Sequence, residues 1–480
     1  MSWNDLINVL PELYLTGSIC VLLLFDAFAG ARYRNAMHWL SMLVLIVTAL
    51  LVVAAQRVGP ATAFSGMYIN DALAGLLKLF SILAVALVFV FASPYLRMRK
   101  LAAGEFHTLA LFALLGIMML VSAGNLVMIY LGLEMLTLSS YALVALDRDS
   151  PRATEAAMKY FVLGAMASGL LLYGMSMIYG ATGTLSLAGI GATLPMSPHY
   201  MLAVFGVVFV LAGIAFKFGA APFHMWLPDV YEGSPTAVTL FVASAPKLAA
   251  VGMALRLLDL GGGLHPLFPY WQDMLAVLAV ASLAIGSLVA IVQSNLKRML
   301  AYSTIGHMGY LLIGLCAGTS FGAAASVFYA IAYVLMSTAA FGVILALART
   351  GFEADQIEDL RGLNQRSPWL AGLMALAMFS LAGVPPLFGF WAKLLVLQAA
   401  IQANLLWLAI VGAVAAIISL FYYLRVVKVM YFDSPAEDRT LIATSDASLR
   451  WVLSLNALAL LALGVFQGPL LDWCLRGITG

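Results

Sequence analysis

Lysines inside apolar sequence are the residues of this chain best suited to chemistry. The stretch 217–247, KFGAAPFHMWLPDVYEGSPTAVTLFVASAPK, begins with Lys217, ends with Lys247 and contains four prolines, a histidine and two acids. An ammonium group is costly in hydrocarbon, and each proline removes a helical hydrogen bond that lipid cannot replace. We therefore expect both amines to face protein or water and the backbone near Pro222 to line a cavity. Groups placed in this way can accept and release protons.

Two further charges in apolar runs belong to the same set. Glu134 lies in YLGLEMLTLSSYALVAL, and Lys393 lies in GFWAKLLVL, just beyond a second proline-containing break. We expect Glu134 to pair with Lys217, since both lie near the middle of their runs. At about 4 Å and an effective dielectric constant of ~20, such a pair interacts by about 4 kcal/mol. Moving one charge across ~100 mV costs about 2.3 kcal/mol, so a pairing switch is large enough to load and unload a proton.

Each of these residues also has a structural interpretation. A neighbour can neutralise a buried acid simply so that it is tolerated, and a lysine near a helix end can extend its amine to the membrane surface. This second interpretation is the strongest alternative to proton transfer at Lys159, because Lys159 lies close to Arg152 and Glu155 near the start of its apolar run. We expect Lys78 to be a surface-anchored lysine.

Histidines and acids near the 217–247 stretch extend the list of candidates. His224 and His307 could relay protons, because the pKa of a free histidine lies near neutrality, or could be structural hydrogen-bond donors. We expect Asp229 and Glu232 to form a solvated rim at the inner mouth of the path.

The composition requires a membrane to hold these residues. The chain is 64% hydrophobic and 10% charged, with a mean hydropathy of +1.01, which indicates an integral membrane protein. The net charge of +2 is spread over scattered basic residues, so we expect no nucleic-acid partner. The three cysteines stand far apart, and neither a metal-binding spacing nor a nucleotide or phosphate loop is recognisable. We therefore expect no cofactor and no metal in this chain.

Apolar runs long enough to cross a bilayer predict an all-α integral membrane protein with about fourteen transmembrane helices. The N-terminus carries acids and no basic region, so the first run is expected to be a retained span. The predicted spans are 9–29, 37–56, 71–93, 106–122, 125–146, 156–180, 201–223, 235–258, 271–293, 298–317, 321–348, 369–400, 404–430 and 448–472.

The distribution of basic residues predicts the orientation. Sixteen lie in connections on one side, whereas only Arg57, Arg256 and Arg476 lie on the other. Because positive loops stay in the cytoplasm, both termini are expected outside it. The full set of fourteen spans favours a bacterium, so we expect a multi-pass protein of the bacterial inner membrane with both termini on the periplasmic side.

Two proline-containing breaks suggest an internal repeat. AAPFHMW lies in the seventh predicted span and AGVPPLFGFWAK in the twelfth, and a unit of five spans places its successor in the opposite orientation. Residues 1–480 are therefore predicted to form a single membrane domain with two inverted five-helix repeats, 106–258 (helices 4–8) and 271–430 (helices 9–13). Discontinuous helices 7 and 12 in such repeats point to an ion site at the membrane midplane.

Three longer motifs resemble a known family. The runs FHMWLPDVYEGSPTAVTLFVASAPK (223–247), NLKRMLAYSTIGHMGYLLIG (295–314) and LAGVPPLFGFWAKL (381–394) are similar to the proton-pumping membrane subunits of respiratory complex I, NADH:quinone oxidoreductase. The likeness extends over nearly the whole chain. PDVYEG, the lysine at position 393 and the end of the chain soon after the last span most resemble the N-type subunits, counterparts of mitochondrial NADH dehydrogenase subunit 2.

The resemblance implies a role for each candidate. Glu134 matches the family's acid of span five and Lys217 the lysine that it modulates. Lys247 and Lys393 match the central-axis lysines of spans eight and twelve, and Lys159 matches a further lysine of span six. NADH, FMN, iron–sulfur clusters and quinone are then bound by partner subunits. The implied partners are the other membrane subunits of complex I, including M-type and small ones, and lipids.

The implied function is proton translocation coupled to quinone reduction elsewhere in the complex. Two alternatives stay open. The chain could belong to a cation/proton antiporter without redox coupling, a class that shares this subunit fold. It could also be a structural spacer in which the lysines do not titrate.

Overall fold

Long helices account for nearly all of the chain in the computed structural model, which describes residues 3–29, 34–258, 263–435 and 446–479. Within these residues, thirteen helical stretches are long and apolar enough to cross a membrane. The remaining predicted crossing, the twelfth, is split into two shorter apolar helices. This architecture confirms the all-α membrane fold class.

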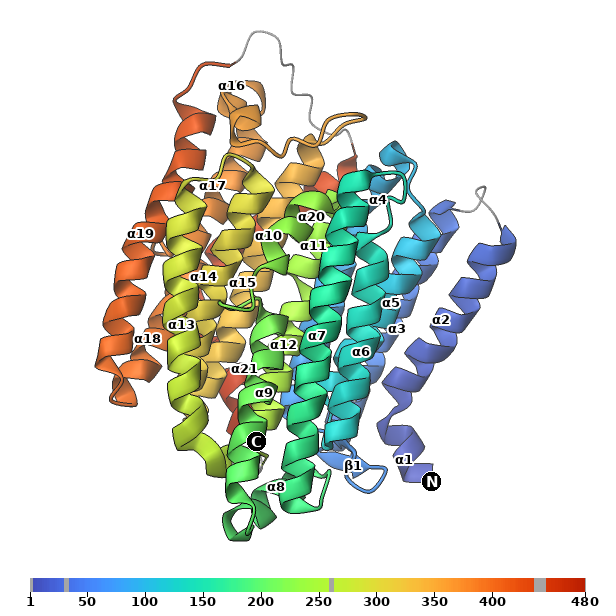
Figure 1. Cartoon of the computed structure of the whole chain (residues 1–480). Helices are drawn as coiled ribbons and strands as arrows, with labels where there is room; N and C mark the ends of the chain where they lie inside the picture. The colour runs from blue at the N-terminus through green and yellow to red at the C-terminus, as the bar shows by residue number, and fades with distance from the viewer. Residues whose placement is uncertain (1–2, 30–33, 259–262, 436–445, 480) are drawn as a thin grey trace.

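The helices alternate in direction through one bundle (Figure 1). The long helices of the bundle are α2 (Leu10–Ala29), α3 (Arg34–Val58), α4 (Ala72–Arg99), α5 (Ala103–Val121), α6 (Leu126–Val144), α7 (Pro151–Thr182), α9 (Tyr200–Phe218), α13 (Phe268–Ile291), α14 (Leu296–Cys316), α15 (Ser320–Leu347), α19 (Leu406–Tyr431) and α20 (Ala447–Val465). The short elements are α1 (Trp3–Asn8), the antiparallel pair β1 (Ala61–Ala63) and β2 (Tyr68–Asn70), α8 (Leu187–Thr193), α16 (Leu363–Arg366), α21 (Gly468–Thr479) and single 3₁₀ turns at Leu194–Met196, His265–Leu267 and Ile357–Leu360.

Three crossings are interrupted near the middle of the bundle. The seventh consists of α9 and, after a gap, α10 (Trp226–Gly233), and the twelfth consists of α17 (Pro368–Ala382) and α18 (Phe388–Gln402). Both of these breaks were predicted from proline. The eighth crossing is also split, into α11 (Thr236–Ala243) and α12 (Ala245–Leu258), and this break at Ser244 was not predicted. In Figure 1, α10, α11 and α17 lie in the upper half of the bundle and α9, α12 and α18 in the lower half.

The same local structure occurs twice, in opposite orientations. Asn125 caps the start of α6 and forms a backbone bridge to Ser186, while Asn295 caps the start of α14 and forms a bridge to Gln356. The bridging partners are equally far apart along the chain in the two cases. The two helices start at opposite ends of the bundle, as inverted repeats require. The boundaries 106–258 and 271–430 stay a prediction.

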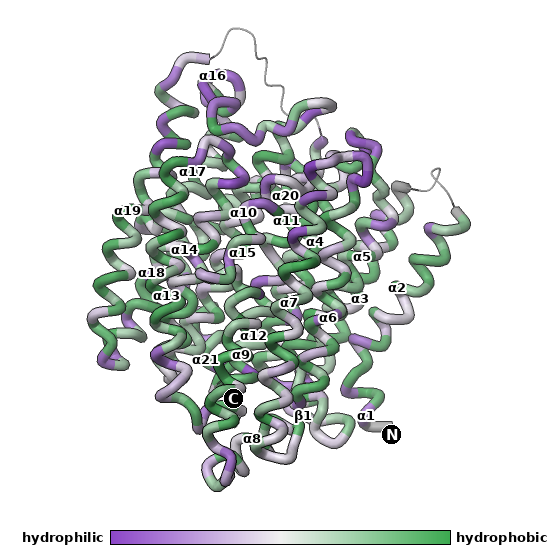
Figure 2. The backbone as a smooth tube through the Cα atoms, viewed as in Figure 1, coloured by the Kyte–Doolittle hydropathy of each residue, from purple (hydrophilic) through white to green (hydrophobic). Residues whose placement is uncertain are grey.

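The interior of the bundle contains α15 and the interrupted crossing α11–α12. Every residue of the membrane-crossing window is buried in α15 and in α11–α12, whereas less than half of it is buried in α2, α3, α7, α19 and α20. Both termini lie at the same end of the bundle (Figure 1). Figure 2 shows hydrophilic residues gathered at the opposite end, around α16, and hydrophobic residues along the crossing helices. The connections that carry most of the basic residues lie at that opposite end, which we call the basic end.

Two sequence-based expectations need correction. The predicted last span, 448–472, ends earlier, since α20 stops at Val465 and α21 is a separate helix. Lys78 is not at the surface: it is 1% exposed. Its Nζ lies 2.6 Å from Glu12 Oε1 and donates to the Tyr68 hydroxyl at 2.7 Å. This buried ion pair joins α2 to α4, which a count of depth along one helix does not reveal.

Candidate functional site: buried lysines at helix breaks

The first break presents a helix end inside the bundle. α9 ends at Gly219, whose φ of +75° is the left-handed conformation that terminates many helices. The Nζ of Lys247, from α12, donates to the carbonyl oxygen of Phe218 at 2.9 Å and lies 5.6 Å from the centre of the Trp226 ring. Lys247 is 1% exposed and makes no ion pair among the residues that the structure describes. The amine is held by a carbonyl and an aromatic face.

The second break has the same construction. α17 ends at Gly383, with φ of +87°. The Nζ of Lys393, from α18, donates to the carbonyl oxygen of Ala382 at 2.8 Å and lies 5.1 Å from the centre of the Tyr310 ring. A positive charge is favourable at this position, because the C-terminal end of a helix carries a partial negative charge. Both amines are therefore stabilised without a carboxylate.

Lys217 lies in the last turn of α9, next to the first break. Its Nζ donates to Thr137 Oγ1 of α6 at 3.3 Å. The two side chains line a cavity of about 10 Å³, which is about the room that one water molecule needs. Glu134, one turn from Thr137 on α6, has a buried Oε1 without a hydrogen-bond partner and makes no ion pair with Lys217 within 4.0 Å. Glu134 and Lys217 thus lie on two helices that the Thr137–Lys217 hydrogen bond joins, but they form no ion pair in this conformation.

The two candidate histidines differ in their contacts. His307 is buried on α14, with hydroxyl groups of Tyr329 and Tyr423 on its two ring nitrogens. His224 follows the first break, is partly buried and has an Nδ1 without a hydrogen-bond partner. His224 is close to Lys217 and Lys247 along the chain. His307 belongs to the surroundings of Lys393.

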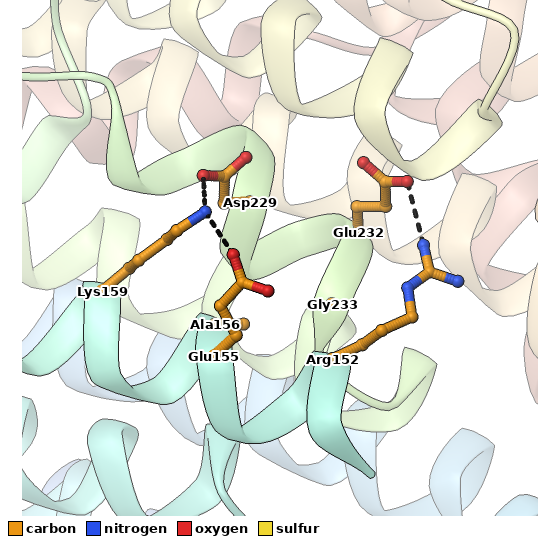
Figure 3. A pocket seen from close by; sticks show the side chains of 7 residues that line it. All are labelled: Arg152, Glu155, Ala156, Lys159, Asp229, Glu232 and Gly233. Atoms are coloured by element: carbon orange, nitrogen blue, oxygen red, sulfur yellow. Dashed lines mark hydrogen bonds and ion pairs between the residues drawn. The ribbon is translucent and has the colours of Figure 1, made fainter.

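Lys159 lies apart from the helix breaks, at the basic end. Its Nζ is 2.8 Å from both Asp229 and Glu155, and its side chain is 43% exposed. Figure 3 shows Lys159 and Arg152 reaching from α7 toward the acids of α10 around a pocket of about 150 Å³. Glu232 lies 3.0 Å from Arg152 in the same pocket. Asp229 and Glu232 are thus partly exposed pocket residues, in agreement with the predicted rim.

Comparison with known proteins identifies the family. Residues 123–419 match the family model described as "NADH:quinone oxidoreductase/Mrp antiporter, TM". The chain is 54% identical over 476 residues to "NADH-quinone oxidoreductase subunit N" of Xanthomonas euvesicatoria pv. vesicatoria (strain 85-10), covering 99% of this chain and 97% of that relative. The chain belongs to the family of NADH-quinone oxidoreductase subunit N.

Solved structures agree with this assignment. A chain of respiratory complex I from Thermus thermophilus with bound aureothin is 31% identical, with a TM-score of 0.81 over 96% of this chain and 98% of that chain. A chain of the Mrp complex from Dietzia sp. DQ12-45-1b is 21% identical, with a TM-score of 0.85 over 98% of this chain and 97% of that one. The second likeness concerns the fold alone.

Several residues of the site in this family member were missed by sequence reasoning. Thr137 contacts Lys217 and lies three residues after Glu134, so helical spacing already placed it on the same face. Gly219 and Gly383 each follow an apolar run and precede proline, which is the pattern of a helix end. Lys297, which lies just outside the predicted span 298–317, is 2% exposed and donates to the Ser234 carbonyl at 2.8 Å.

Proposed function

We propose that this chain is the proton-translocating membrane subunit of an NADH:quinone oxidoreductase, and that protons pass along its buried lysines. The observation that supports this most directly is the placement of Lys247 and Lys393. Each amine is buried beside an interrupted helix and held by one carbonyl, without a permanent carboxylate partner. Because a buried ammonium without a counter-charge is costly, the charged and neutral forms of such an amine can be close in free energy.

The proposed path follows the midplane from Lys217 to Lys247 and then to Lys393. The segment between α9 and α10, which contains His224, would carry the proton from the first lysine to the second with the help of water. Among the described residues, no hydrogen bond joins Lys247 to Lys393, so water is needed there as well. Lys159 is proposed as a further relay at the basic end, in contact with the pocket of Figure 3.

Glu134 is proposed to control the proton affinity of Lys217. In the present conformation its Oε1 is buried without a hydrogen-bond partner, and it makes no ion pair with Lys217. A small rotation of α6 or of the Glu134 side chain toward Lys217 would favour the charged amine, and the return would release the proton. About 4 kcal/mol for such a pair exceeds the ~2.3 kcal/mol that ~100 mV imposes on one charge.

Electron transfer is assigned to other subunits in this proposal. We place NADH, FMN, the iron–sulfur clusters and quinone reduction there, and we place the basic end of this subunit in the bacterial cytoplasm and both termini in the periplasm. The antiporter alternative predicts cation/proton exchange by the purified chain alone. The redox-coupled function instead predicts that the chain purifies with an NADH-oxidising arm.

The test uses the intact assembly in membrane vesicles. Lys217→Ala and Glu134→Ala are compared with Lys428→Ala, a control at a lysine with a 63% exposed side chain and a surface ion partner. We expect NADH-driven proton pumping to fall by about tenfold or more for Lys217→Ala and by a smaller factor for Glu134→Ala. The control should be unchanged. Normal pumping by both test variants would leave only the spacer alternative.

A further inference from the structure

A chain of hydrogen-bonded side chains surrounds His307 and connects three helices. Nδ1 of His307 lies 2.7 Å from the Tyr329 hydroxyl on α15, and Nε2 lies 3.0 Å from the Tyr423 hydroxyl on α19. The Tyr423 hydroxyl is also hydrogen-bonded to the hydroxyl of Ser303 on α14. All four side chains are buried, with exposures between 0% and 3%. The four groups therefore form a continuous, buried hydrogen-bonded network.

The hydrogen-bonded network around His307 begins beside Lys393. The amine of Lys393 lies over the ring of Tyr310, and that ring is stacked on Tyr329 at 6.0 Å with an interplanar angle of 19°. The hydroxyl of Tyr310 donates to the carbonyl of Gly412 at 2.7 Å and is therefore already engaged. Tyr329 thus carries the first available hydroxyl.

The hydrogen-bonded network around His307 ends nearer to the basic end of the bundle. α14 starts at that end and α19 finishes there. Ser303 lies in the first half of α14, and Tyr423 lies in the second half of α19. The four groups therefore lead from the level of Lys393 toward the basic end.

The chemistry of imidazole suits it to the centre of this chain. A neutral ring has one N–H donor and one acceptor nitrogen, and here each nitrogen has a hydroxyl that can take the complementary part. When Nδ1 takes the Tyr329 proton, Nε2–H gives its proton to the Tyr423 oxygen, the Tyr423 proton passes to Ser303, and Ser303 releases its own hydroxyl proton to water on the basic side. The Tyr329 oxygen takes its replacement proton from the Lys393 ammonium through water, which leaves that amine neutral. Each group between the amine and the final water gains one proton and loses one, so none keeps a charge. After the transfer the imidazole is in its other tautomer, with the proton on Nδ1. Rotation of the ring and of the hydroxyl groups would return the network to its starting state.

We propose that Tyr329 and Tyr423 are proton-relay residues that, with His307, connect the surroundings of Lys393 to Ser303 on the basic side of the midplane. This inference rests on the proposed function, since it adds a branch to the lysine path. It assigns the two hydroxyl groups a role in transfer in addition to packing.

The test removes single hydroxyl groups and keeps the rings. Tyr423→Phe and Tyr329→Phe are made in the intact assembly, with Tyr333→Phe as the matched control. Tyr333 lies one turn from Tyr329 on α15 and is equally buried, but its hydroxyl bonds Thr304 at 2.7 Å and not the imidazole. NADH-driven pumping is measured in H₂O and in D₂O, and Lys393→Ala is measured in parallel.

We expect Tyr423→Phe and Tyr329→Phe each to lower pumping by about tenfold or more and to change the solvent isotope effect. The double variant should be no worse than either single one, because a broken chain is not broken further. Tyr333→Phe should stay within about twofold.

Pumping at the wild-type rate in both test variants, or an equal loss in Tyr333→Phe, would overturn the relay. If Lys393→Ala alone is impaired, the lysine path stands and only the relay is wrong. If Lys393→Ala also pumps normally, the proposed function is wrong as well.

Discussion

The two helix breaks at Gly219 and Gly383 use one device to hold an amine. In each, a half-helix ends in a glycine with positive φ, and a lysine donates to the last carbonyl before that glycine with an aromatic ring beside it. Proline follows in both, after a cis peptide bond. The device occurs in helices that run in opposite directions, so each half of the membrane presents a C-terminal helix end to a lysine near the midplane.

The breaks differ in what surrounds the lysine. At the first break the amine comes from the next crossing, as Lys247, and a second lysine, Lys217, lies within reach of α6 and its unpaired Glu134. At the second break Lys393 comes from the same interrupted crossing, and its further neighbours are neutral tyrosines and His307. This difference is consistent with our two proposals, in which charge pairing regulates the first break and hydroxyl groups carry protons from the second.

The largest expected effect comes from substitutions that distinguish two roles of Lys247 and Lys393, proton transfer and capping of a helix end. Lys247→Arg and Lys393→Arg keep the positive charge and the donors for the carbonyl, but a guanidinium does not release its proton in proteins. We expect NADH-driven pumping to fall by about tenfold or more in each, as far as in Lys247→Met and Lys393→Met. Pumping is measured per assembled complex. Restoration of pumping by arginine would mean that these lysines only cap a helix.

The breaks were predictable to different degrees. Pro222 and the prolines of AGVPPLFGFWAK lie inside apolar runs, and proline cannot continue a helical ladder, so both of these positions followed from sequence. The break at Ser244 did not, although Pro246 lies beside it. A proline near a helix start fits the first turn of a new helix as well as a kink, and only the packing around Ser244 decides between them.

The contacts of the lysines could not be predicted in the same way. Lys247 and Phe218 are far apart in sequence, and their hydrogen bond depends on how α12 packs against the end of α9. Counting along a span gives the depth of Glu134 but not the rotation of its helix. In the structure the hydrogen bond of the Lys217 amine goes to Thr137 and not to Glu134. The error at Lys78 has the same origin, since its partner Glu12 comes from another helix.

An intermediate effect should distinguish the two glycines. A Cβ at position 383 would lie 2.9 Å from Cδ of Lys393, whereas at position 219 it would meet the side chain of Leu227. Either alanine also strains a left-handed backbone by about 1–2 kcal/mol. We expect both Gly383→Ala and Gly219→Ala to lower the yield of assembled complex. Only Gly383→Ala should also lower pumping per complex, by a few-fold, because it displaces an amine. Equal pumping in the two variants would show that Gly383 only ends the helix.

The smallest expected effect concerns Thr137, whose hydroxyl accepts from Lys217 beside the first break. Thr137→Val keeps the shape of the side chain and removes the hydroxyl that accepts from Lys217. A hydrogen bond to a charged group contributes about 1.5–3 kcal/mol, and water in the adjacent cavity can replace much of it. We therefore expect pumping to change by about twofold to threefold, and the loss should disappear when Glu134→Gln is already present. Such non-additive losses would show that Thr137 and Glu134 act together on the amine of Lys217. Additive losses would show that the hydroxyl acts independently of the acid, and Glu134 would then have no demonstrated route to Lys217.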